Sequence, residues 1–108
     1  MTKKLALLAF VLILFAFTPT FSSAQDAAAT FKAKCAMCHG PDGSGKTTMG
    51  EKFNIHDLRS AEVQKQSDAE LVQIVTKGKN KMPSYDGKLT KEQIDQLVAY
   101  VRELSKKK

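Results

Sequence analysis

Cysteine is scarce in this chain of 108 residues, because Cys35 and Cys38 are the only two and they stand close together. A disulfide between them would close a very small loop and would constrain little of the unfolded chain. Histidine is equally scarce, with only His39 and His56. A structural zinc ion needs four ligands, usually two pairs, and adjacent Cys38 and His39 make tetrahedral closure awkward. A disulfide scaffold is therefore excluded, and a zinc site is a weak alternative.

Long apolar runs are also absent, apart from one at the N-terminus. Lys3 and Lys4 precede an apolar run over residues 5–17 of about 13 residues, shorter than the roughly 20 that a membrane-spanning helix needs. Small residues follow at Ser22 to Ala24, as at a signal-peptidase site. We expect residues 1–24 to be a cleaved secretory signal peptide rather than an uncleaved anchor. The product, residues 25–108, would be a single exported domain, periplasmic in a bacterium and without stable membrane insertion.

A domain of this size buries only about 60% of its unfolded surface and needs reinforcement. With a disulfide framework excluded, a bound prosthetic group is the obvious reinforcement. The net charge of +6 falls to +4 when Lys3 and Lys4 are removed, which still favours acidic partners. Nucleic acid is a poor fit, because the chain has no helix-turn-helix or zinc-finger pattern.

The chain shows no repeat and no strand-like alternation, so it is predicted to be all-α. One helix is expected to begin near Asp26 and to carry the cysteines at its C-terminal end. Two further helices should begin at capping boxes, in which each end residue satisfies the backbone N–H of the other. These two helices are expected over residues 67–78 and 90–104. Between the first helix and these two, we expect an irregular stretch over residues 46–57 and a short helical turn over residues 57–63.

The stretch Cys35-Ala36-Met37-Cys38-His39 carries the strongest signal in the sequence. A thioredoxin-type redox dithiol would need a helix N-terminus and a βαβ context, and neither is predicted here. C-x-x-C-H is the attachment motif of a c-type haem. Two thiols one helical turn apart can add to the two vinyl groups on one porphyrin edge, and the histidine is then delivered to the iron. We therefore predict one covalent haem c, attached at Cys35 and Cys38 and ligated by His39.

The haem prediction requires a ligand on the other face of the iron. Met37 lies inside the attachment motif and cannot reach that face. Met82 precedes Pro83, which fixes the backbone where a loop must present a thioether. Met82 is the predicted sixth ligand, and Met49 and His56 are weaker alternatives.

These segments together resemble the small bacterial class I monohaem cytochromes c, of the cytochrome c6-like and oxidase-associated groups. The resemblance rests on "CAMCHG", "GKNKMPSY" and "LTKEQIDQLVAYVREL", which occur in the family's order. It implies three main helices and a short one wrapped around the haem. It also implies that Phe31 and Ala27 meet Leu97 and Tyr100 where the first and last helices cross. Pro41 lies too close to His39 for its carbonyl to accept the Nδ1–H, so the sequence names no acceptor.

The resemblance implies a soluble one-electron carrier rather than an enzyme. Its partners would be redox proteins with acidic docking surfaces, such as a membrane oxidase or reductase complex, and the chain would be a monomer. A rim of residues such as Lys79 and Lys81 would surround the exposed haem edge. Two alternatives stay open at this point: a haem-based sensor or peroxidase with an open or labile sixth position, and a haem-free thiol oxidoreductase.

Overall fold

The computed structural model describes residues 23–107, with side chains from Asp26 onward. Within this range the chain is helical, and its only β-type pairings are two isolated bridges, so the all-α prediction is confirmed. The helices are α1 (Ser23–Lys34), α2 (Ala36–His39), α3 (Thr48–Lys52), α4 (Ala61–Gln64), α5 (Asp68–Lys77) and α6 (Lys91–Lys106). Three of these are long, as expected, but three short helices replace the single one predicted. The predicted signal peptide lies outside the described residues except for Ser23 and Ala24.

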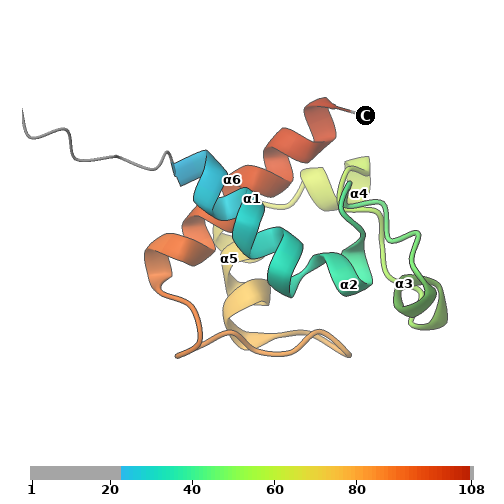
Figure 1. Cartoon of the computed structure of the whole chain (residues 1–108), viewed down its shortest axis with the longest axis horizontal. Helices are drawn as coiled ribbons and strands as arrows, with labels where there is room; N and C mark the ends of the chain where they lie inside the picture. The colour runs from blue at the N-terminus through green and yellow to red at the C-terminus, as the bar shows by residue number, and fades with distance from the viewer. Residues whose placement is uncertain (1–22, 108) are drawn as a thin grey trace, which may run out of the picture.

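Helices α1 and α6 cross, and this crossing organises the domain (Figure 1). Ala27 and Phe31 are buried on α1, at 4% and 2% exposure. The Phe31 ring packs against Tyr100 of α6 with centroids 5.2 Å apart and planes tilted by 53°. Phe31 also shares a core cluster with Leu97. The crossing implied by the resemblance is therefore present, and the two α1 residues named for it, Ala27 and Phe31, are both buried.

Helix α6 has one apolar face that serves two clusters. Ile94, Leu97 and Leu104 pack with Phe31 of α1, whereas Val98 packs with α4 and α5. The N-terminus of α6 has the predicted capping box, because Thr90 and Gln93 exchange hydrogen bonds in both directions. Burying such an amphipathic stripe is what stabilises a helix of this length in a small domain.

The box predicted at the start of α5 is only half formed. The Ser67 side chain accepts from the Glu70 N–H. The Glu70 carboxylate, however, accepts from the Ser67 hydroxyl at 3.2 Å. The helix still ends as predicted, at Gly78.

The prediction that one helix carries the cysteines is wrong in detail. Helix α1 ends at Lys34, and Cys35 has φ −114° before α2 begins. The Cys38 N–H donates to Cys35 O at 3.3 Å, whereas an unbroken helix would direct it to Lys34 O. Cys35 therefore stands at a junction between two helices.

The stretch predicted to be irregular, residues 46–57, contains α3. Thr47 caps this helix by accepting a hydrogen bond from the Gly50 N–H. The short turn predicted over residues 57–63 contains α4, which Ser60 caps because its hydroxyl accepts from the Val63 N–H.

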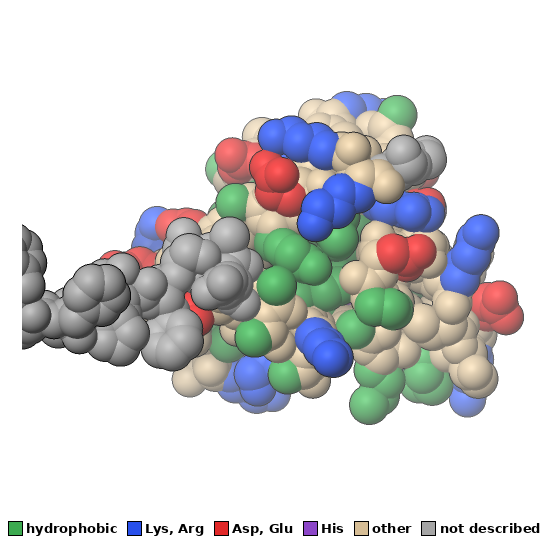
Figure 2. All heavy atoms as spheres, turned by 45° about the horizontal axis from the view of Figure 1, so that its top comes forward, with side chains coloured by type: hydrophobic (Ala, Val, Ile, Leu, Met, Phe, Trp, Pro, Cys, Tyr) green, Lys and Arg blue, Asp and Glu red, His purple; other side chains and the backbone are tan. Residues whose placement is uncertain are grey.

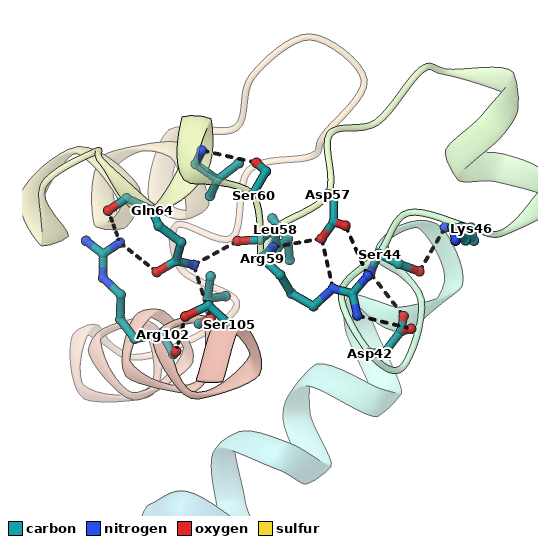
Figure 3. A network of polar contacts seen from close by, with 12 residues as sticks. Asp42, Ser44, Lys46, Asp57, Leu58, Arg59, Ser60, Gln64, Arg102 and Ser105 are labelled. Atoms are coloured by element: carbon teal, nitrogen blue, oxygen red, sulfur yellow. Dashed lines mark hydrogen bonds and ion pairs between the residues drawn. The ribbon is translucent and has the colours of Figure 1, made fainter. Parts of the chain in front are cut away.

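Side-chain hydrogen bonds fix the segment between α3 and α5 to α6 (Figure 3). Arg102 donates to Gln64 O at 2.9 Å and to Gln66 O at 2.6 Å. The Gln64 amide donates to Leu58 O at 2.8 Å. Arg59 pairs with Asp57 at 3.0 Å and approaches Asp42 at 3.8 Å. These contacts hold the irregular backbone between α3 and α5 in place against α6.

On the surface, basic side chains are interspersed with acidic and hydrophobic ones across the face drawn in Figure 2. No helix in residues 23–107 is long and apolar enough to cross a membrane.

Candidate functional site

A cavity of about 430 Å³ opens between the helices, and all four predicted site residues line it. Cys35, Cys38 and His39 come from the α1–α2 junction and α2, and Met82 comes from the loop between α5 and α6. The volume lies in the range of roughly 300–1,000 Å³ typical of cofactor sites. Residues far apart in sequence are thus brought to one chamber.

The walls of the cavity are mainly apolar. Phe31 and Leu97 line it from the α1–α6 crossing, and Leu71 from α5. Phe53 and Ile55 line it from the segment after α3. A flat, largely apolar macrocycle buried here would add to the core of a small domain.

The two cysteines are half-buried and form no disulfide with each other. Burial raises the pKa of the Cys35 thiol to about 11, with Lys34 opposing the rise and Cys38 adding to it. A redox dithiol requires a lowered thiol pKa, so this environment is opposite to the one that a thiol oxidoreductase needs. The described residues also hold no cluster of three or more His, Cys, Asp or Glu side chains that could hold a metal ion.

His39 has a ring nitrogen, Nδ1, that is buried and has no hydrogen-bond partner among the described residues. The sequence had named no acceptor for this nitrogen. Burial also lowers the pKa of the imidazole. The ring is therefore neutral at neutral pH, which is the form that binds a metal. An apolar chamber with two thiols at one edge and a neutral imidazole fits a covalently attached haem.

The carbonyl end of α2 is held by residues that the sequence reasoning missed. The Thr47 hydroxyl donates to Cys38 O at 2.7 Å, and the Gly45 N–H donates to His39 O at 2.7 Å. Gly50 is buried against this point, where a Cβ would lie 2.7 Å from Cys38 O. The signal in the sequence was Thr47 itself, a good N-cap residue one position before α3.

The Met82 segment is fixed by its own backbone. Met82 N–H donates to Lys79 O at 2.9 Å, and Lys79 N–H donates to Met82 O at 3.2 Å. Gly78 precedes this turn with φ +78°, and a Cβ there would lie 2.6 Å from Met82 O. The Ser84 hydroxyl donates to Thr76 O at 2.7 Å, which ties the segment to the end of α5.

The structure also brings both weaker candidates for the sixth ligand to the cavity. Met49 lines it and is half-buried. His56 lines it with a side chain that is 67% exposed and 3.6 Å from Glu62. Met37, which its place inside the attachment motif had already excluded as a sixth ligand, is 78% exposed.

Comparison with known proteins identifies the family. The family described as cytochrome c oxidase, cbb3-type, subunit III matches residues 22–101. The chain belongs to the c-type cytochromes. The cytochrome is 36% identical to cytochrome c6 of Synechococcus sp. over 83% of this chain and 79% of that protein. It is 35% identical to cytochrome c6 of Nostoc sp. over 91% of this chain and 87% of that protein.

Two further likenesses extend this result. The cytochrome is 38% identical to the cbb3-type cytochrome c oxidase subunit CcoP of Rubrivivax gelatinosus, over 68% of this chain but only 23% of that subunit. A solved structure, the KustC0563 c-type cytochrome, superposes with a TM-score of 0.67 and 31% identity, over 72% of this chain and 95% of that one. The protein is a small monohaem class I c-type cytochrome, a class of electron-transfer proteins, and it carries one covalently bound haem c. The fold class and the cofactor predicted from the sequence are confirmed.

Proposed function

We propose that this cytochrome is an exported, soluble, one-electron carrier. Cys35 and Cys38 form the thioether links, and His39 and Met82 are the axial ligands. The observation that supports this most is that these four side chains line a single apolar cavity. The haem supplies one-electron exchange at its iron. We infer that residues 1–24 are removed on export.

The chain's own residues then have distinct tasks. The two cysteines would anchor the group at the α1–α2 junction, and neutral His39 and Met82 would both bind its iron. Two protein ligands would leave no room there for a substrate, and a methionine ligand would raise the reduction potential. The apolar walls contributed by Phe31, Leu71 and Leu97 keep water away from the group. This assignment makes the cytochrome a carrier and not an enzyme.

Basic residues support a docking role for the cavity rim. Lys34, Lys79 and Lys81 line the cavity. Lys52 and Lys81 also lie over the Phe53 ring, at 5.6 and 5.9 Å from its centroid. A redox partner with an acidic docking surface, such as a membrane oxidase or reductase complex, would be attracted to this rim. The cytochrome would meet it as a monomer.

Absorption spectra of the holoprotein, oxidised and reduced, test the ligand assignment. Covalent haem survives acid–organic extraction, and Met82 ligation gives a low-spin spectrum with a weak red iron–sulfur band in the oxidised form. Met82→Ala should abolish that band and open the iron to cyanide or carbon monoxide.

Met49→Ala is the matched control, because Met49 lines the same cavity, and it should leave the band in place. If Met49→Ala abolishes the band and Met82→Ala does not, the sixth ligand has been misassigned. A high-spin spectrum of the wild-type protein, together with ready binding of carbon monoxide, would point instead to a sensor or peroxidase.

A further inference from the structure

We propose that Tyr85 is a positioning residue that ties the Met82 segment to the α1–α2 junction across the cavity and thereby resists displacement of Met82. The Tyr85 hydroxyl donates a hydrogen bond of 3.1 Å to Lys34 O. Met82 lies three positions before Tyr85, and Lys34 immediately precedes Cys35. The inference rests on the proposed function, because it requires Met82 to be the sixth ligand.

The acceptor exists because of the helix break. In a continuous helix Lys34 O would receive the Cys38 N–H, but that N–H donates to Cys35 O instead. The Lys34 carbonyl is therefore turned out of the helical ladder at the attachment junction. A carbonyl at a helix end needs a partner from elsewhere, and the Tyr85 hydroxyl supplies it.

The other end of Tyr85 is firmly held. Its N–H donates to Val75 O at 3.2 Å, at the end of α5. Its carbonyl accepts from the N–H groups of Lys88 and Leu89, both at 3.0 Å. The ring lines the cavity and packs on the core cluster that contains Phe31. Tyr85 is therefore held in place through both its backbone and its ring, and is not a mobile surface side chain.

The remaining contacts of the Met82 segment run mostly to its own side of the cavity. Ser84 binds Thr76 of α5, and Met82 pairs with Lys79 within the segment. Lys81 reaches across, but only as an ammonium group 5.9 Å from the Phe53 centroid. The Tyr85–Lys34 contact is thus a direct hydrogen bond from the Met82 segment to the side of the cavity that carries the cysteines and His39.

The test is imidazole binding to the oxidised holoprotein, monitored through the loss of the red iron–sulfur band. Tyr85→Phe removes only the hydroxyl, and imidazole should then displace Met82 at an apparent dissociation constant about fivefold lower, the effect of one modest hydrogen bond. Tyr100→Phe is the matched control, because Tyr100 packs on Phe31 at the helix crossing and is remote in sequence from the Met82 segment. It should leave the dissociation constant unchanged.

A double substitution separates positioning from general stability. If Tyr85 acts through Met82, then Tyr85→Phe should have no effect on imidazole binding once Met82 is already alanine. Unchanged binding in Tyr85→Phe alone would overturn the inference, as would an equal effect in the presence and absence of Met82. Failure of the proposed function looks different: Met82→Ala itself would then bind imidazole as the wild type does.

Discussion

The Thr47 hydroxyl donates a 2.7 Å hydrogen bond to Cys38 O and accepts a 2.8 Å hydrogen bond from the Gly50 N–H. One side chain thereby closes the carbonyl end of α2 and caps the N-terminus of α3. The backbone beside His39 is consequently fixed by a residue that does not line the cavity, and its substitution should affect stability before it affects ligation.

Thr47→Val keeps the shape of the side chain but removes both hydrogen bonds. We expect a loss of about 1–2 kcal/mol in the free energy of unfolding, the usual effect of losing an N-cap and leaving a partly buried carbonyl unpaired. Denaturant unfolding of the holoprotein measures it. Thr47→Ser should retain most of the wild-type stability, and equal losses in the two variants would show that the hydroxyl is not responsible.

Gly50→Ala tests the close approach of α3 to α2. The added Cβ would collide with Gly45 O and would also lie 2.7 Å from Cys38 O, so backbone must move, at a cost of about 2–4 kcal/mol in the free energy of unfolding. Gly87→Ala is the control: Gly87 has φ +77° but nothing within 4 Å of the added Cβ, so it should lose only about 1 kcal/mol from backbone strain. Similar losses at the two positions would contradict the packing argument.

Arg102→Lys should destabilise the segment between α4 and α5. Lysine cannot reproduce the guanidinium fork that reaches Gln64 O at 2.9 Å and Gln66 O at 2.6 Å. We expect a loss of about 1–2 kcal/mol, measured by thermal or denaturant unfolding. The matched control is Lys106→Met on the same helix, whose exposed ion pair with Glu103 should contribute less than about 0.5 kcal/mol.

Asp42 should contribute a stability that depends on pH. Hydrogen bonds from Ser44, with a smaller contribution from Arg59, hold the pKa of this carboxyl below its ordinary value. A group whose pKa is lower in the folded state stabilises the fold above its unfolded pKa, and this stabilisation disappears as the pH falls through the folded pKa.

The difference in free energy of unfolding between wild type and Asp42→Asn should therefore be constant above about pH 5 and vanish in stronger acid. Ser44→Ala removes the largest cause of the shift, so in that background the difference should vanish at a higher pH. A wild-type to Asp42→Asn difference that does not change between neutral pH and strong acid would contradict this assignment.

Local signals were read correctly from the sequence where one residue decides the structure. Thr90 and Gly78 stand at the predicted start of one helix and the predicted end of another, because caps and positive-φ glycines act through neighbouring backbone. The C-x-x-C-H motif likewise predicted the cofactor, because its spacing is specific to one chemistry.

The sequence could not predict what depends on distant contacts. No glycine or proline marks the break at Cys35, and the turned-out Lys34 carbonyl is satisfied by Tyr85 from far along the chain. Helix α3 was missed because Gly45 and Gly50 flank or interrupt a short segment of low helix propensity. Its existence depends on the contact between Thr47 and Cys38, which only the folded chain provides.

The crossing of α1 and α6 joins the two ends of the domain, and this has a consequence for the order of events during synthesis. A chain that emerges from its N-terminus presents Phe31 long before Tyr100 exists to cover it. Contacts between segments so distant in sequence slow folding, because a long loop must close before they can form. The crossing therefore cannot form until the last helix has been synthesised, so the two ends of the domain are fixed together and neither helix can be completed as a folded unit without the other.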